Sequence, residues 1–233
     1  MNPSPPLDAD ATGVQAPPID PAAIDPTHVA VVIPALNEEL RIRDVVLGAL
    51  AYCPNVIVID DGSTDDTSAV VERMDIPGVR LIRQENAGKP AALNTGIAAA
   101  THDVLVLVDG DTVFEPDAMK ALVEPLSDPC VGAVSGNTKV GNRGGLLGRW
   151  QHIEYVIGFN LDRRMFDVLQ CMPTVPGAIG SFRRQTLEAV GGVSDDTLAE
   201  DTDLTMAICR SGWRVVYAPL ARAWTEAPAT LGQ

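Results

Sequence analysis

The sequence is poor in basic residues, and this limits its partners. Lysine and arginine total 17 against 31 aspartates and glutamates, which leaves a formal net charge of −14 at pH 7. Nucleic-acid binding needs a basic surface, so the charge argues against a nucleic-acid partner. It also argues against attachment to an anionic membrane through the overall charge of the domain. An anionic substrate therefore needs local help from a metal ion, a lysine or helix amino termini.

Cysteines and long apolar runs are also scarce. The four cysteines lie far apart and form no C-x-x-C pair. This argues against a disulfide framework or a zinc site and fits a reducing compartment. No stretch approaches the roughly 18 apolar residues of a membrane span, and no secretory signal opens the sequence. Taken alone, these absences predict a soluble, cytoplasmic chain.

The 233 residues, 46% of them hydrophobic, are enough for one large α/β domain. Residues 1–27 are rich in Pro, Ala and Asp without periodicity and predict a disordered leader, so the fold is expected to begin at His28. From there, short apolar runs alternate with helical patterns, which predicts a parallel sheet with right-handed crossovers. Strands are expected over 29–33, 56–59, 79–82 and 104–108, and helices over 39–52, 67–74, 90–100 and 116–126.

After residue 130 the rhythm changes. No repeat or linker is visible, which predicts one domain with two functional halves. The later strands are expected over 131–140, 181–184, 214–218 and 221–225, and the later helices over 146–169 and 198–211, the second closed by Gly212.

The apolar run V-L-V-L-V at 104–108 ends in two acids, Asp109 and Asp111. The run is typical of a strand buried on both faces of a parallel sheet, and open α/β sheets bind ligands at the carboxyl ends of such strands. Two oxygen donors so close together can hold a divalent cation that neutralises a diphosphate. The same residues also suit an ordinary turn.

Two further strands end in polar groups at the same predicted edge. The first is followed by P-A-L-N-E-E at 34–39 and the second by D-D-G-S-T-D at 60–65. Ser63, Thr64 or Asp65 could simply cap a helix. Three polar strand ends together nevertheless favour a nucleotide site, because parallel strands bring their carboxyl ends to one edge.

Three other segments could carry chemistry. Lys89 enters a helix just before Pro90, where helix-terminal amides favour phosphate, although it could be a solvated surface lysine. Asp201 could face the cleft as a general base, whereas Glu200 and Asp203 are accounted for as partners of a helix dipole. The Gly-rich segment P-G-A-I-G-S-F-R-R at 176–184 could let a substrate approach the backbone, or could only form a tight turn.

Taken in order, these motifs resemble those of the family 2 glycosyltransferases, inverting enzymes of the GT-A fold. The matching segments are P-A-L-N-E-E, D-D-G-S-T-D, N-A-G-K-P-A-A-L-N-T-G at 86–96, D-G-D at 109–111, P-G-A-I-G-S-F-R-R, and A-E-D at 199–201. The likeness covers about residues 28–230. It implies a Rossmann-like, mostly parallel sheet flanked by helices, with the nucleotide at the carboxyl ends of the strands. The pattern of motifs most resembles that of the membrane-embedded, processive synthases of chitin, hyaluronan, cellulose or poly-N-acetylglucosamine. Among these, it favours the branch that uses N-acetylglucosamine.

The resemblance also implies a reaction and a role for each matching residue. An acceptor hydroxyl would attack a UDP-sugar, such as UDP-N-acetylglucosamine or UDP-glucose, to make a β-linked polysaccharide or glycoconjugate. Residues 28–130 would form the donor half and residues 131–233 the acceptor half. On the donor side, the resemblance implies that Ala35, Asn37 and Glu38 contact the uridine, that Asp60 and Asp61 lie near the base and ribose, and that Lys89 binds the nucleotide or diphosphate. It implies that Asp109 approaches the ribose and phosphate and that Asp111 binds Mg²⁺ or Mn²⁺. Asp201 would be the catalytic base, and Gly177, Gly180 and Glu200 would lie on the acceptor side.

One departure from the family pattern concerns the Q-x-x-R-W motif of processive members. Arg149-Trp150 has Leu146 at the glutamine position and lies too early, and the sequence ends at Gln233 before the motif is reached. Flanking transmembrane helices are also missing. The resemblance thus implies a truncated catalytic fragment of a larger protein at the cytoplasmic face of the plasma membrane, and leaves open whether this fragment is active alone.

Three rival functions use fewer of the motifs. A haloacid-dehalogenase-like phosphatase would use V-L-V-L-V-D-G-D-T-V at 104–113, with Asp109 as nucleophile and Asp111 as acid/base. That motif should open its fold, however, and here about a third of the domain precedes it. A dehydrogenase would need a G-x-G-x-x-G motif after the first strand, and this sequence has none there. A non-catalytic nucleotide-binding module would keep the donor pocket without turnover.

Overall fold

The computed structural model describes residues 25–140, 163–195, 197 and 199–225. Residues 1–24 of the predicted leader lie outside this part, as do Leu146, Arg149, Trp150 and most of the predicted helix over 146–169. Asp25 is described, and Pro26–His28 form a short 3-10 turn ahead of the first strand. Among the helices that the structure describes, none could span a lipid bilayer.

The first half of the chain alternates strands and helices, close to the predicted ranges. Its elements are β1 (Val29–Ala35), α1 (Ile42–Leu50), β2 (Val56–Asp60), α2 (Thr67–Met74), β3 (Val79–Arg83), α3 (Lys89–Ala99), β4 (Val104–Leu107), β5 (Val113–Phe114), α4 (Ala118–Val123) and the 3-10 helix η3 (Glu124–Ser127). The second half contains β6 (Val131–Val140), α6 (Arg163–Val168), β7 (Gly180–Arg183), α7 (Arg184–Val190), α8 (Glu200–Arg210) and β8 (Arg214–Thr225).

These strands form a single sheet in the order β3-β2-β1-β4-β7-β6-β8-β5. Strands β3, β2, β1 and β4 run parallel to one another. Antiparallel pairing begins where β7 joins β4, and only β6 and β8 pair in parallel beyond that point. Four of the seven pairs are therefore parallel, and the prediction of a mostly parallel α/β sheet flanked by helices is confirmed.

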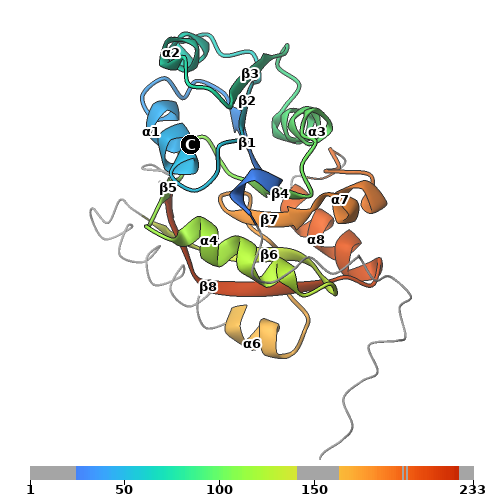
Figure 1. Cartoon of the computed structure of the whole chain (residues 1–233). Coiled ribbons are helices and arrows are strands. Elements are labelled where there is room, and N and C mark those ends of the chain that lie inside the picture. Colours follow the sequence, from blue (N-terminus) through green and yellow to red (C-terminus); the bar gives the residue numbers. More distant parts are fainter. Residues whose placement is uncertain (1–24, 141–162, 196, 198, 226–233) are drawn as a thin grey trace, which may run out of the picture.

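Helices cover both faces of the sheet, which explains why the central strands are apolar throughout. Alternate residues of β1 point to opposite faces, and all seven are buried. One face packs against α1, α2 and α4, and the other against α3, α7 and α8. Figure 1 shows α1 and α3 on opposite sides of β1. With both faces covered, the carboxyl edge of the strands is the place left for a ligand.

Three elements differ from the sequence prediction. The two-residue strand β5 had no local signal, since its pairing partner β8 lies about a hundred residues later. Helix α7 was not predicted from the sequence, and it is followed by Gly191, which has a left-handed φ of 82°. The predicted break between residues 218 and 221 was wrong, because β8 continues through Pro219. A register shift against β6 accommodates this segment, and Asn137 Nδ2 donates to the Pro219 carbonyl at 3.1 Å.

Helix α3 sits close to the sheet because Gly96 lacks a side chain. A Cβ there would lie 2.2 Å from Val32 Cγ1 and 3.3 Å from Ile59 Cγ1. We expect Gly96→Ala to reduce the free energy of unfolding by about 1–2 kcal/mol, even after a gain of about 1 kcal/mol in helix propensity. The melting temperature should fall by about 2–6 °C. Ala98→Ser, on the exposed side of the same helix, is the control, and equal melting temperatures for the two variants would contradict this packing argument.

Candidate functional site

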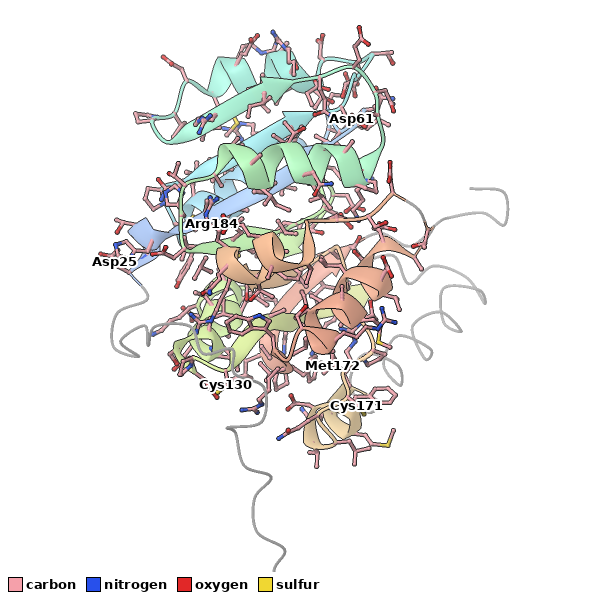
Figure 2. The ribbon with its side chains drawn as sticks, turned by 90° about the vertical axis from the view of Figure 1, so that its right-hand side faces the viewer. Asp25, Asp61, Cys130, Cys171, Met172 and Arg184 are labelled. Carbon is pink, nitrogen blue, oxygen red and sulfur yellow. The ribbon has the colours of Figure 1, made fainter. Side chains whose placement is uncertain are left out.

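A cavity of about 300 Å³ opens at the carboxyl edge of β1, β2 and β4. Figure 2 shows Asp61, after β2, and Asp25, before β1, at opposite ends of these strands. The convergence predicted from parallel topology is thus confirmed. The residues that line the cavity come from all the predicted strand ends and from the start of α3. They are Pro34, Ala35, Leu36, Glu38, Asp61, Gly88, Lys89, Ala92, Asp109, Gly110 and Asp111.

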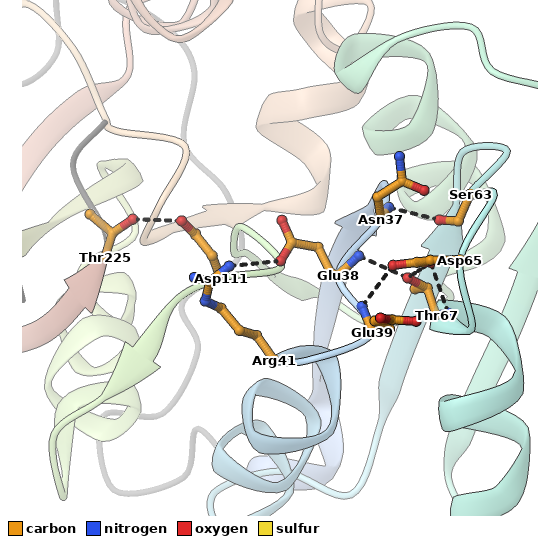
Figure 3. A network of polar contacts seen from close by, with 9 residues as sticks. All are labelled: Asn37, Glu38, Glu39, Arg41, Ser63, Asp65, Thr67, Asp111 and Thr225. Atoms are coloured by element: carbon orange, nitrogen blue, oxygen red, sulfur yellow. Dashed lines mark hydrogen bonds and ion pairs between the residues drawn. The ribbon is translucent and has the colours of Figure 1, made fainter. Parts of the chain in front are cut away.

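The loop after β1 is tied to the loop after β2. Asn37, with a left-handed φ of 58°, accepts a hydrogen bond from the Thr64 amide at 2.9 Å, and its own amide donates to Ser63 Oγ at 3.0 Å. The Glu38 amide donates to Thr67 Oγ1 at 2.8 Å (Figure 3). Asn37 is exposed and is not among the residues that line the cavity, so in this structure its side chain joins two loops.

The adjacent acids Asp60 and Asp61 have different surroundings. The Asp60 carboxylate accepts bonds from the Ser63 amide, at 2.8 Å, and from Ser68 Oγ. Burial acts to raise the pKa of Asp60, but these bonds and nearby Arg83 outweigh it, so the pKa is lowered. Asp60 therefore stays ionised beneath its loop and does not line the cavity.

Asp61 lines the cavity and also organises the next loop. Its carboxylate accepts bonds from Gln84 Nε2 at 2.7 Å and from the amides of Ala87 and Gly88 at 3.0 and 2.9 Å. Gly88 adopts a φ of 89° just before α3 begins. Asp61 thereby fixes where Lys89 enters the cavity.

Lys89 bridges the two halves of the chain. Its Nζ lies 2.8 Å from Asp109 Oδ1, at the end of β4, and 3.7 Å from Glu200 Oε1, at the start of α8. Burial acts to lower the pKa of Lys89, but Asp109 and Asp201 outweigh it and the pKa is raised. Lys89 is therefore a partly buried cation surrounded by acids, and the alternative of a solvated surface lysine does not hold.

Asp201 lies beside Lys89 in the first turn of α8. Its Oδ2 accepts a hydrogen bond from the Gly177 amide at 2.7 Å. A Cβ on Gly177 would lie 2.4 Å from Lys89 Nζ and 3.1 Å from the Asp201 carboxylate oxygens, so a larger residue there would displace the lysine. Burial raises the pKa of the Asp201 carboxyl above its ordinary value, and Lys89 and the Gly177 bond offset only part of this rise. A raised pKa suits a carboxylate that must accept a proton.

Gly180 is not part of this cluster. It lies in β7, paired with Leu107 and Ser135. A Cβ there would meet Val175 Cγ1 at 2.5 Å and Phe182 at 3.0 Å, so this glycine serves close packing in the sheet. Within the Gly-rich segment, it is Gly177 that lies against the charged groups, next to Lys89 and Asp201.

Glu38 and Asp111 form a second acidic pair on the cavity wall. Burial raises the pKa of Glu38, Asp111 raises it further, and Arg41, whose guanidinium is 3.7 Å from Glu38 Oε2, acts against this. Asp111 Oδ2 accepts a hydrogen bond from Thr225 Oγ1 at 3.1 Å (Figure 3). Neither Arg41 nor Thr225 was found from the sequence. Thr225 carries no local signal, because its contact spans 114 positions.

These acids can contribute to a divalent site without enclosing one. Across the part of the chain that the structure describes, no three His, Cys, Asp or Glu side chains converge on a common metal position. Mg²⁺ and similar ions usually take one or two protein carboxylates, several waters and the phosphates of a substrate. Asp111, with Glu38 behind it, fits such a site, whereas Asp109 is paired with Lys89.

Comparisons with known proteins agree with this architecture. The model of a family described as "Glycosyltransferase like family 2" matches residues 26–233. The poly-β-1,6-N-acetyl-D-glucosamine synthase of Staphylococcus aureus (strain COL) is 34% identical over 204 residues, which cover 84% of this chain and 49% of that protein. A synthase of the same name from Staphylococcus epidermidis is 28% identical over 212 residues, covering 88% of this chain and 51% of its own. The chain thus spans about half the length of these relatives.

Solved structures show the same fold. A mannosyltransferase from Pyrobaculum calidifontis, in complex with GDP-Man and Mn²⁺, superposes with a TM-score of 0.73 at 26% identity, over 91% of this chain and 60% of its own. Glucosyl-3-phosphoglycerate synthase from Mycobacterium tuberculosis, in complex with Mn²⁺, UDP-glucose and phosphoglyceric acid, gives a TM-score of 0.62 at 24% identity, over 86% and 72%.

Proposed function

Since the chain belongs to the family 2 glycosyltransferases, we propose that it moves a sugar from a UDP-sugar to an acceptor hydroxyl, with inversion at the anomeric carbon. The observation that carries this proposal is the cluster of Lys89, Asp109 and Asp201, which adjoins the nucleotide-sized cavity. The cluster places a cation and a carboxylate of raised pKa side by side. Leaving-group stabilisation and proton removal need such a pair.

The cavity accounts for the donor side. Ala35, Glu38 and Asp61 line the part formed by β1 and β2, where uridine and ribose would lie, with Asn37 and Asp60 shaping the loops behind them. Asp109 serves the ribose and phosphates together with Lys89. The donor sugar we propose is N-acetylglucosamine or glucose, and the similarity to the staphylococcal synthases supports the former.

Asp111 would hold Mg²⁺ or Mn²⁺. Bound there with a diphosphate, the ion would supply neutralisation of the charge that develops on departing UDP. Lys89, which also lines the cavity and is 2.8 Å from Asp109, adds a second positive charge. The Mn²⁺ in the complex of the mannosyltransferase supports this choice of cofactor.

Asp201 would act as the general base. Its carboxylate takes the proton of the acceptor hydroxyl as that oxygen forms a bond to the anomeric carbon, and the bond from this carbon to the UDP oxygen breaks. Gly177 orients the base through its amide, and Glu200 adds negative charge on the acceptor side. Attack opposite the leaving group yields a β-linked product.

The wider setting is also part of this proposal. We assign residues 28–130 to the donor half and 131–233 to the acceptor half of a catalytic unit within a longer protein at the cytoplasmic face of the plasma membrane, where it makes a β-linked glycan. The family match over residues 26–233 covers the segments that a phosphatase of the haloacid-dehalogenase type would leave unused.

Calorimetric titration with UDP, with and without Mn²⁺, tests the donor site. We expect Mn²⁺-dependent binding in the parent chain, and we expect Asp111→Asn to weaken it by about tenfold or more, because a ligating carboxylate is lost. Asp117→Asn, an exposed change at a residue whose left-handed φ of 62° suits asparagine, is the matched control. A parent chain that binds UDP without regard to Mn²⁺ would overturn the donor-site assignment.

Release of UDP from a panel of UDP-sugars tests turnover. We expect one donor to be consumed well above the others in the presence of Mn²⁺ and an acceptor glycan. Metal-dependent UDP binding without turnover of any donor would leave only the non-catalytic nucleotide-binding function.

A further inference from the structure

Asp111 is hydrogen-bonded to a residue that lies 114 positions later in the chain. Its Oδ2 accepts a hydrogen bond from Thr225 Oγ1 at 3.1 Å, and Thr225 is the last residue of β8 (Figure 3). We infer that Thr225 is a positioning residue that orients Asp111 for the divalent cation. This inference rests on the proposed function and goes beyond it, since it makes the end of the acceptor half part of the metal site in the donor half.

The backbone brings these two residues together. Immediately after Asp111, the chain forms β5, in which Val113 pairs with Trp224 and Phe114 with Ala223. The ladder extends by one bond, from the Glu115 amide to the Arg222 carbonyl at 3.0 Å. Continued by one residue, this antiparallel register puts Thr225 opposite Thr112, next to Asp111 in the chain, and the Thr225 hydroxyl then reaches the Asp111 carboxylate.

A charged cluster reinforces this pairing. Glu115 lies 3.6 Å from Lys139 Nζ and 3.5 Å from Arg222 Nη1, and it accepts a bond from Trp224 Nε1 at 3.1 Å. Lys139 also lies over the Trp224 ring, 5.2 Å from its centroid. These contacts join β5, β6 and β8, so the position of Thr225 does not depend on its own hydrogen bond.

The hydroxyl matters because Asp111 faces another acid. Glu38 lies close enough for Asp111 to raise its pKa, and like charges push the two side chains apart. The Thr225 bond engages Oδ2, so the other oxygen of Asp111 can ligate a cation without losing its support. Ligating carboxylates in metal sites are commonly held by such hydrogen bonds, whose loss costs about 10- to 100-fold in metal affinity.

The test compares two substitutions of Thr225 with a control. Thr225→Val keeps the branched shape and the strand preference but removes the donor, whereas Thr225→Ser keeps the hydroxyl. Thr138→Val is the matched control, because Thr138 pairs with Ala223 on the neighbouring strand and its buried Oγ1 has no hydrogen-bond partner among the described residues. The readout is Mn²⁺ affinity at saturating UDP, measured from the electron paramagnetic resonance signal of unbound Mn²⁺, together with the melting temperature of each variant.

We expect Thr225→Val to raise the Mn²⁺ dissociation constant by about tenfold, and Thr225→Ser and Thr138→Val to stay within about twofold of the parent. Unchanged Mn²⁺ affinity in Thr225→Val, or an equal loss in Thr225→Ser, would overturn the positioning role. If the parent chain itself bound no Mn²⁺ with UDP, the proposed function would fail. If the parent bound Mn²⁺ but Thr225→Val did so equally well, only this inference would fail.

Discussion

Replacing Asp201 by Asn is expected to lower kcat for sugar transfer by roughly a thousandfold, because general-base catalysis contributes on the order of 10²–10⁴. The amide keeps an oxygen that can accept the bond from the Gly177 amide, which is 2.7 Å from Asp201 Oδ2. It cannot take the proton of the acceptor hydroxyl. UDP binding should be retained, because Asp201 is not among the residues that line the donor cavity.

The measurements are steady-state turnover of the preferred UDP-sugar and UDP affinity by calorimetry. Asp203→Asn provides the matched control, because Asp203 also lies in the first turn of α8 and the change removes the same charge from the same helix end. A comparable loss of kcat in both variants would mean that helix electrostatics, not proton transfer, explains the effect of Asp201.

Replacing Lys89 by Met is expected to reduce kcat by about a hundredfold, as for removal of one group that stabilises developing negative charge. It should also change the pH dependence. Lys89 holds the pKa of Asp201 down against the effect of burial, so the pKa of Asp201 rises further when that charge is removed. The base works only when deprotonated, and activity is lost as pH falls through its pKa. The acidic limb of the pH–kcat profile should therefore move to higher pH.

Lys89→Arg is the control for this prediction, because it keeps the positive charge. Its acidic limb should stay near that of the parent chain, even if kcat falls through a poorer fit beside Gly177. An acidic limb that did not move in Lys89→Met would show that the lysine acts on the donor alone and leaves the base unaffected.

Much of the donor site follows from local sequence. The apolar runs of β1, β2 and β4 are buried on both faces, and their polar ends meet because parallel strands share an edge. The roles of the individual acids were harder to predict from the sequence. Asp60 and Asp61 are adjacent in one motif, yet Asp60 is enclosed by Ser63 and Ser68 while Asp61 binds the loop before Lys89. Alternation along a strand sends neighbours to opposite sides, and only the packing shows which side holds the ligand.

The second half was harder to predict because its pairing is non-local. Strand β5 has two residues and exists because β8 pairs with it, and the same pairing brings Thr225 to Asp111. Gly177 was selected for its small size, but its actual neighbours, Lys89 and Asp201, come from helices far apart in the chain. Such contacts leave no periodicity in either segment.

Local sequence was enough to predict a mostly parallel α/β sheet and acids at the strand ends, and its motifs resemble those of the family 2 glycosyltransferases. Hydrophobic periodicity and short motifs are local properties, and they suffice for these conclusions. The ion pair of Lys89 with Asp109 beside Asp201, and the hydrogen bond from Thr225 to Asp111, become visible only in the folded chain. These relations depend on distances of a few ångströms between segments up to 114 positions apart, which are set by how helices and strands pack.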